Sequence, residues 1–334
     1  MDFTLIICTY MRPAPLQNLM DSVVKQTLYP NEILIVDGST NNHTKEFIEN
    51  SSFKNLKYFL VSKEDRGLTK QRNFGLAHVS QSSEVVCFLD DDTVLEPNYF
   101  EEIIKTYQND ETITGVAGIA INEDRWIKKE SGKTYDKNKF YELDGYVYPE
   151  GSRNVIRNIL GLQSKLGSGM MPAFSHGRNC GFPMNGRIYE VDLLIGMSFS
   201  FRREVFEKIK FSHYFEGYGL YEDADYSIRA QRFGRNVVST NAQLSHYHDQ
   251  SGRPNKYQYG KMVTRNGWYV WRLKYPNPAF GDQLKWNLIS FLLTIIRFTN
   301  AFTTGKRKEA FTESVGRTAG WFSLWFNAPK INDK

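Results

Sequence analysis

The stretch Val85-Val86-Cys87-Phe88-Leu89-Asp90-Asp91-Asp92-Thr93 decides the fold class, because an apolar segment of strand length runs directly into three consecutive carboxylates. Three like charges in a row repel one another, so they are tolerated at a strand end only if water solvates them or a cation offsets them. The carboxyl ends of strands in an open α/β sheet are also where ligands bind. Two interpretations stay open. The oxygens could hold Mg²⁺ or Mn²⁺ with a phosphate-bearing substrate, or the acids could cap the next helix.

The chain before this stretch alternates apolar runs of strand length with segments of helical spacing. Residues 3–8 form a continuous apolar run, typical of a strand buried on both faces; residues 32–36, 56–61 and 85–89 are predicted as further strands, and residues 67–79 as a helix. This alternation predicts an α/β fold with a parallel sheet and right-handed crossovers.

Composition restricts the class of protein. The 334 residues are 41% hydrophobic and 24% charged, and the net charge of +5 is too weak to indicate a nucleic-acid binder. Cys8, Cys87 and Cys180 lack metal-ligand spacing, and the first two are expected to be buried thiols in a reducing compartment. No signal-peptide pattern and no long uncharged apolar run is present, so we expect a cytoplasmic protein, with the inner face of the membrane left open.

Polar residues follow three of the predicted strands. Thr9 and Arg12 follow the first, Asp37 and Ser39 the second, and Asp90–Asp92 the fourth, so a parallel sheet would bring them into one crevice. There Asp37 could accept hydrogen bonds from a base or ribose, and the aspartates could hold a metal on a diphosphate. The dinucleotide fingerprint and the Walker A loop are both absent, which excludes an ordinary dehydrogenase and a P-loop nucleotidase.

Four motifs, in this order and rough spacing, resemble those of glycosyltransferase family 2: Ile6-Ile7-Cys8-Thr9-Tyr10-Met11-Arg12-Pro13, Ile35-Val36-Asp37-Gly38-Ser39, Gly67-Leu68-Thr69-Lys70-Gln71-Arg72-Asn73 and Phe88-Leu89-Asp90-Asp91-Asp92. Family members often have Asn at the position of Met11. The resemblance implies the GT-A fold, in which a mixed, mostly parallel sheet is flanked by helices, here with a helical C-terminal extension.

The resemblance also implies site residues. Asp90 would face the ribose and Asp92 would ligate the metal. The nucleotide sugar would be bound by Thr9, Arg12, Asp37, Ser39, Arg72, Asp90 and Asp91. Arg72 suits this role because a guanidinium pairs with phosphate oxygens in a bidentate way; the alternative is an exposed helix arginine.

Two later segments carry the remaining implied residues. Gly196 and Met197 lie in a predicted acceptor loop. In Glu222-Asp223-Ala224-Asp225, the resemblance implies that Asp223 is the general base and that Glu222 helps to bind the acceptor, with Asp225 structural. The alternative is that these acids only favour a helix N-terminus electrostatically.

The segment Ser245-His246-Tyr247-His248-Asp249 supplies a candidate metal ligand. Two histidines in alternation could project to one face of an extended segment. The resemblance implies that one His completes the metal site; we favour His246 over His248, and a pair of plain loop histidines is the alternative.

The rest of the chain is less regular. Residues 122–189 lack clean periodicity and are interpreted as a substrate loop or a disordered insertion. Residues 253–275 mix basic and aromatic side chains, and 283–302 form an apolar helical stretch, so this region is predicted either to lie on a membrane surface or to pack on the catalytic core or a second subunit.

These observations predict a catalytic domain over 1–250, with a nucleotide-binding half (1–115) and an acceptor half (116–250), and a helical region over 251–334. The resemblance implies a metal-dependent inverting transferase that moves a sugar from a nucleotide-diphosphate donor, with a UDP-sugar favoured, to a hydroxyl of a glycan or lipid-linked acceptor in cell-surface polysaccharide assembly. The rivals are a retaining GT-A transferase and a non-catalytic sugar-nucleotide or glycan-binding module. A homo-oligomer stays open, and no nucleic-acid partner is expected.

Overall fold

The computed structural model describes residues 1–248 and 254–331. Asp249, Arg253 and the predicted domain boundary at 250/251 lie outside these described residues. The chain divides into two compact units, each assembled from two separate stretches: unit 1 comprises residues 1–124 and 184–252, and unit 2 comprises residues 125–183 and 253–334.

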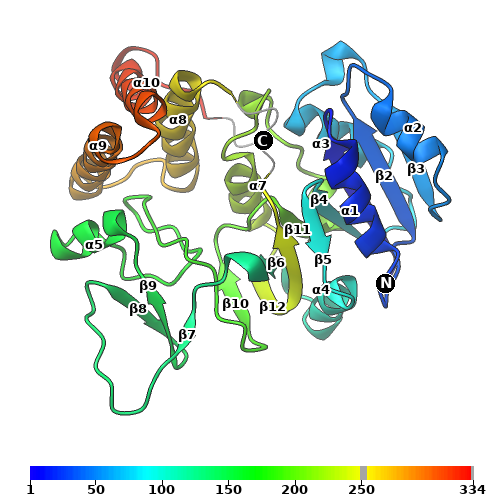
Figure 1. Cartoon of the computed structure of the whole chain (residues 1–334), viewed down its shortest axis with the longest axis horizontal. Coiled ribbons are helices and arrows are strands. Elements are labelled where there is room, and N and C mark those ends of the chain that lie inside the picture. The colour runs from blue at the N-terminus through cyan, green and yellow to red at the C-terminus, as the bar shows by residue number, and fades with distance from the viewer. Residues whose placement is uncertain (249–253, 332–334) are drawn as a thin grey trace. The chain divides into compact units, whose positions relative to one another are not determined.

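Unit 1 is organised around a mixed sheet that has nine strands within the described residues (Figure 1). Eight strands follow the order β10-β12-β6-β11-β4-β1-β2-β3, and β5 pairs with β12. The pairs β1–β2, β2–β3, β1–β4 and β6–β12 are parallel, whereas β11 is antiparallel to both of its neighbours. The strands are β1 (Phe3–Thr9), β2 (Glu32–Asp37), β3 (Leu56–Leu60), β4 (Val85–Asp90), β5 (Thr93–Leu95), β6 (Ile113–Ala120), β10 (Ile188–Val191), β11 (Ser198–Arg202) and β12 (Arg235–His246).

Helices pack along this sheet and bury its apolar faces (Figure 1). The core between β1 and α1 is fully closed: Leu5, Ile7, Leu16 and Leu19 all have 0% exposure. Gly75 lets α3 approach the sheet closely, because a Cβ there would come within 2.8 Å of Ile6. The helices of unit 1 are α1 (Pro13–Val23), α2 (His43–Glu49), α3 (Leu68–Ala77), α4 (Tyr99–Asn109), α6 (Arg203–Phe206) and α7 (Glu222–Ala230).

The predicted convergence of strand ends is confirmed. β1 lies between β2 and β4, and the parallel register places Thr9 beside Asp37 and Cys8 beside Asp90. The carboxyl ends of these three strands therefore meet at one edge of the sheet, where ligands bind in open α/β folds.

The segment of residues 122–189, interpreted from the sequence as a substrate loop or a disordered insertion, includes regular secondary structure. It contains a three-stranded antiparallel sheet of β7 (Ile127–Lys128), β8 (Phe140–Leu143) and β9 (Tyr146–Pro149), followed by helix α5 (Ser152–Ile159). These strands are only two to four residues long, too short for a period of two to be recognised in the sequence.

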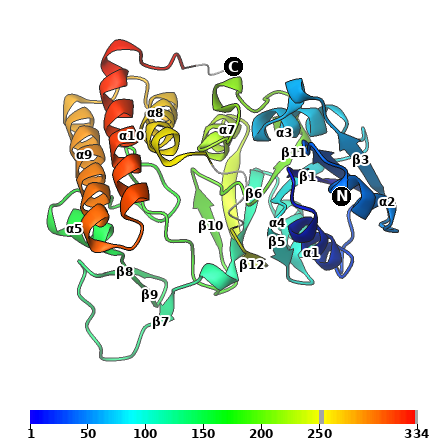
Figure 2. The ribbon, with the colours of Figure 1, turned by 45° about the horizontal axis from the view of Figure 1, so that its top comes forward.

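The rest of unit 2 is a group of three long helices, α8 (Lys256–Lys274), α9 (Phe280–Thr303) and α10 (Arg307–Phe326), with α10 packed on both others (Figure 2). Glycines bring α8 and α10 into backbone contact: a Cβ at Gly316 would lie 2.1 Å from the Tyr257 carbonyl oxygen. Among the described residues, no helix is long and apolar enough to cross a membrane.

Candidate active site

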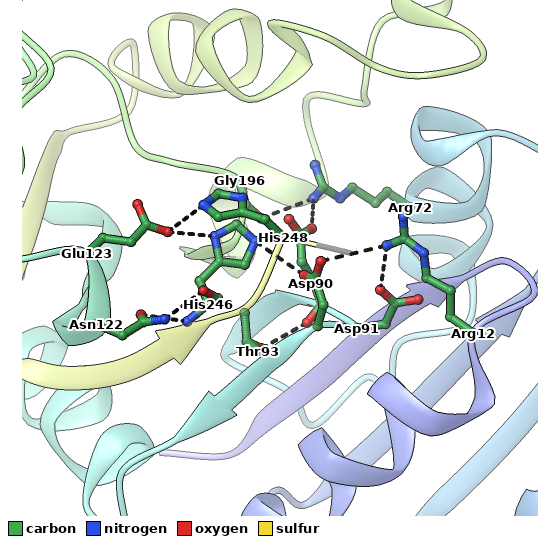
Figure 3. A network of polar contacts seen from close by, with 11 residues as sticks. Arg12, Arg72, Asp90, Asp91, Thr93, Asn122, Glu123, Gly196, His246 and His248 are labelled. Atoms are coloured by element: carbon green, nitrogen blue, oxygen red, sulfur yellow. Dashed lines mark hydrogen bonds and ion pairs between the residues drawn. The ribbon is translucent and has the colours of Figure 1, made fainter. Parts of the chain in front are cut away.

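The three aspartates differ in environment. Asp90 ends β4 with 35% of its side chain exposed, whereas Asp91 and Asp92 are only 3% and 7% exposed. Of the two ways in which such a cluster is tolerated, the last two aspartates use an offsetting cation rather than water. Arg12 Nη1 donates to Asp91 Oδ1 at 3.0 Å (Figure 3) and lies 3.8 Å from Asp92 Oδ2.

The helix-capping interpretation of this cluster is also wrong. The aspartates lead into strand β5, and the next helix, α4, begins at Tyr99 after Asn98. Asp91 is held by Thr9, whose hydroxyl donates to Oδ2 at 2.7 Å. Burial raises the pKa of Asp91 to about 7, although the Arg12 charge and the Thr9 hydrogen bond both act to lower it.

His246 lies beside the aspartates at the end of β12. Its Nε2 is 3.2 Å from Asp92 Oδ1, and potential ligand atoms of Asp90, Asp92 and His246 all lie within 4.8 Å of one another. Carboxylate oxygens with one imidazole nitrogen make a donor set that suits Mn²⁺ or Mg²⁺. These residues therefore fit a divalent cation, and they include both metal ligands predicted from the sequence.

Two residues that contact His246 were not predicted from the sequence. Glu123 Oε1 is 3.2 Å from His246 Nδ1 and 2.7 Å from His248 Nε2 (Figure 3). Asn122 exchanges hydrogen bonds with the His246 backbone, accepting from its N–H at 2.9 Å and donating to its carbonyl at 2.8 Å. Both residues lie more than 120 positions before His246, so no local spacing could indicate the contact. Glu123, His246 and His248 also form a second group of closely placed potential ligands.

Arg72 is not the exposed helix arginine of the alternative interpretation, because only 2% of it is exposed. Its guanidinium lies over the rings of Phe88, Phe199 and Phe211, at 4.8–5.7 Å from the ring centroids. It donates to Glu222 and lies 3.4 Å from Asp90 Oδ1, so it joins the two acidic groups of the site.

The backbone before β11 connects these groups. Gly196 donates its N–H to Asp223 Oδ2 at 3.0 Å and accepts from Arg72 Nη2 at 3.1 Å, and the carbonyl of Met197 accepts from the Asp90 N–H at 3.1 Å. A Cβ at residue 196 would lie 3.1 Å from the Asp223 Cβ and 3.2 Å from Glu222 Oε1. The contact between this loop and α7 is therefore tight enough to favour glycine.

The acids at the start of α7 have three different environments. Asp225 is fully buried and paired with Arg229, as a structural residue would be. Glu222 is 4% exposed, and its Oε2 has no hydrogen-bond partner among the described residues. Burial raises the pKa of Glu222 to about 8, against the lowering effect of Arg72. Asp223 is half-buried and stands beside Gly196.

The other predicted nucleotide-binding residues lie at the same sheet edge but face inward. Asp37 is 0% exposed; its Oδ1 accepts from the Ser39 N–H and its Oδ2 from the Tyr58 hydroxyl, each at 2.8 Å. Ser39 in turn accepts from the Met11 N–H at 2.8 Å. In this structure Asp37 and Ser39 therefore fix the loops that follow β1 and β2.

Comparison with known proteins gives a consistent result. Residues 4–168 match the family described as Glycosyl transferase family 2. O-antigen chain rhamnosyltransferase RfbN of Salmonella typhimurium is 28% identical over 118 residues, which cover 35% of this chain and 37% of RfbN. Glucosyl-dolichyl phosphate glucuronosyltransferase of Haloferax volcanii is 26% identical over 148 residues, covering 43% of this chain and 45% of that protein. The matches thus span less than half of each relative.

Among solved structures, the mannosyltransferase PcManGT from Pyrobaculum calidifontis, in complex with GDP-Man and Mn²⁺, superposes with a TM-score of 0.55 at 12% identity, covering 98% of this chain and 88% of PcManGT. This likeness concerns the fold, and it confirms the GT-A architecture expected from the sequence motifs.

Proposed function

This chain belongs to glycosyltransferase family 2, and from that premise we propose that it is a metal-dependent inverting transferase, which moves a sugar from a nucleotide-diphosphate donor to a hydroxyl of a glycan or lipid-linked acceptor. One observation carries the proposal. The Gly196 peptide binds Asp223 through its N–H and Arg72 through its carbonyl, and Arg72 also contacts Asp90. The same peptide thereby links a candidate base to a candidate metal cluster, and a transfer reaction depends on such relative positioning.

Asp90, Asp92 and His246 would hold the divalent cation, either Mg²⁺ or Mn²⁺. When bound, such a cation offsets negative charge on a diphosphate leaving group. The protein's own part is to orient these ligands. The Glu123 carboxylate lies 3.2 Å from His246 Nδ1 and can accept its N–H, which would keep the proton on that nitrogen and leave Nε2, on the Asp92 side, free to bind the cation.

Asp223 is the proposed general base. It would take the proton from the acceptor hydroxyl as that oxygen attacks the anomeric carbon; the bond from that carbon to the diphosphate oxygen breaks, and the nucleoside diphosphate leaves with the electron pair. The Gly196 N–H holds the carboxylate of Asp223 at 3.0 Å. Glu222, with Oε2 unpartnered, is proposed to position the acceptor. General-base catalysis of this kind contributes about 10²–10⁴-fold.

The donor would lie along the ends of β1, β2 and β4, where Thr9, Asp37 and Asp90 share one sheet edge. We propose a UDP-sugar as the first donor to test. Arg12, which is partly exposed, and the buried Ser39, Arg72 and Asp91 are proposed to shape this edge, with Gly196 and Met197 forming the acceptor side.

A lipid-linked acceptor in cell-surface polysaccharide assembly is the favoured substrate class. The name of the Haloferax volcanii relative includes a dolichyl phosphate-linked sugar, and that of the Salmonella relative includes O-antigen chains. We propose accordingly that the C-terminal region brings the protein to the inner face of a membrane, where such acceptors are presented.

A panel of UDP-, GDP-, dTDP- and CMP-sugars tests the proposal. We expect one donor to raise the melting temperature only when Mn²⁺ or Mg²⁺ is present, because a ligand of the folded state stabilises it by mass action. With an acceptor extract, the same donor should release its nucleotide, and chelator should stop the release. Donor binding without turnover on any acceptor would favour the binding-module alternative.

A further inference from the structure

Helix α9 carries an apolar stripe that no other described element covers. Its exposed apolar residues recur every three or four positions over the whole helix and are 40–81% exposed: Phe280, Leu284, Leu288, Phe291, Ile295, Phe298 and Phe302. This spacing places them on one side of the helix. The opposite side, with Trp286 and Ile289, is buried. A continuous apolar surface of this kind marks an interaction site.

At the junction of α9 and α10, the stripe meets a cluster of phenylalanines and three basic residues. The ring of Phe298 lies 5.5 Å from that of Phe302 and 6.0 Å from that of Phe311. Lys306 lies just before α10, Arg307 and Lys308 are its first two residues, and all three are exposed. Cations beside exposed aromatic rings are typical of a segment that inserts its rings between lipids and places its charges at the phosphates.

The other end of α10 carries a second aromatic cluster. Trp321 lies 5.0 Å from Phe322 and 5.3 Å from Trp325, and Trp325 and Phe326 are 66% and 87% exposed. Because amphipathic indole rings favour the boundary between water and hydrocarbon, these residues suit the edge of a membrane-facing surface.

The charge of the two units identifies the kind of partner. Unit 2 contains 24 Lys and Arg against 9 Asp and Glu, whereas unit 1 contains 18 against 28. The net charge of the whole chain, +5, thus combines about +15 in unit 2 with about −10 in unit 1. A strongly basic unit with an exposed apolar helix complements an anionic lipid surface.

We propose that α9 and α10 form a docking surface for an anionic bilayer, with the stripe of α9 lying in the plane of the interface. The inference rests on the proposed function, because it names the surface on which a lipid-linked acceptor would be met. α9 has 24 residues and carries Lys285 and Arg297 within its length. It is therefore suited to lie in the interface rather than to span the membrane.

Vesicle flotation of the full chain tests the proposal. Wild type should float with phosphatidylcholine–phosphatidylglycerol vesicles and much less with phosphatidylcholine alone, and salt should weaken the binding. The double variant Phe291→Ser/Phe302→Ser should lose about tenfold or more in affinity, and K306Q/R307Q/K308Q should lose the preference for the anionic lipid. Val24→Ser/Leu60→Ser, which alters exposed apolar residues of unit 1, is the matched control and should bind as wild type does.

Two results would overturn the proposal. One is the failure of wild type to float at low salt. The other is a dimer in analytical ultracentrifugation that Phe291→Ser/Phe302→Ser dissociates, because the stripe would then be a subunit interface. Donor-dependent thermal shifts, measured without vesicles, separate these failures from a failure of the proposed transferase activity, since the stripe variants should leave such shifts unchanged.

Discussion

Glu123 contacts two histidines that are two positions apart, His246 at the end of β12 and His248 just after it. A carboxylate behind a metal-binding imidazole fixes the ring and raises its basicity, and removing it typically costs about 10- to 100-fold in metal affinity. We therefore predict that Glu123→Gln weakens Mn²⁺ binding by this factor in calorimetry. Glu111→Gln, at an exposed position of unit 1, is the control and should bind as wild type does.

Metal binding should also depend on pH. Burial alone would lower the pKa of His246, but the hydrogen bond and charge of Asp92, with the charges of Asp90 and Glu123, raise it overall. A metal ion requires the unprotonated imidazole, so we predict that the Mn²⁺ affinity falls as the pH falls through the raised pKa of His246. The Mn²⁺ affinity of a His246→Gln variant should be lower than that of wild type and should depend less on pH. If its pH profile is the same as that of wild type, His246 is not a metal ligand.

The stability of the folded chain should also depend on pH, through the ionisation of Asp91. Its pKa is about 7 in the folded chain and near 4 when unfolded, so the folded state holds the proton over this range. Its contribution is present at low pH and is lost as the pH rises towards 7. In chelator, Asp91→Asn should reduce the loss of unfolding free energy between pH 5 and pH 8 by about 1–3 kcal/mol. Urea titrations at the two pH values measure this, and equal losses in both proteins would contradict a pKa of Asp91 that burial raises in the folded state.

Residue identities in the local motifs could be predicted from the sequence, whereas their partners could not. The aspartates after β4 and the acids of α7 stand in short segments whose composition is informative in itself. The link from Arg72 to Glu222 spans 150 positions and that from Glu123 to His246 spans 123. Such pairs arise only when the sheet brings distant loops together, so no local pattern encodes them.

At the scale of elements, α8 and α10 are held close by glycines. A Cβ at Gly316 would lie 2.1 Å from the Tyr257 carbonyl oxygen, and one at Gly260 would lie 2.2 Å from that of Glu313. Overpacking of this kind typically costs about 1–3 kcal/mol. We predict that Gly316→Ala lowers the unfolding free energy of unit 2 by this amount in thermal or urea denaturation. The matched control is Gly281→Ala, near the start of α9, where a Cβ meets nothing within 4 Å; it should be neutral or slightly stabilising.

Long, strongly patterned elements were predictable, and short ones were not. The sequence indicates β1, β2 and β4 as largely apolar segments, because both of their faces are buried, and it indicates α9 as a helix through its periodicity. The strands β7–β9 are two to four residues long and mostly half-exposed or exposed, so they are too short for their sequence to show a period.

At the scale of the whole molecule, the small net charge hides a separation of charge between the two units, to which we propose different roles. A chain with a charge of +5 looks unremarkable, yet the acidic and basic residues separate between two units that each combine distant stretches. The acidic unit holds the candidate site and the basic unit holds the exposed stripe of α9. A linear count cannot reveal this separation, because the fold assigns residues 125–183 to the same unit as the C-terminal helices.

The central claim, a transfer site with Asp223 as its base, is tested most directly by comparing Asp223→Asn with Glu222→Gln and Asp225→Asn in donor binding and turnover. We predict that Asp223→Asn still binds the nucleotide sugar with metal, while its turnover falls by about two to four orders of magnitude. Glu222→Gln should mainly raise the acceptor KM. Near-normal turnover of Asp223→Asn together with an inactive Glu222→Gln would indicate that Glu222 is the general base. Full activity of all three variants would contradict the account.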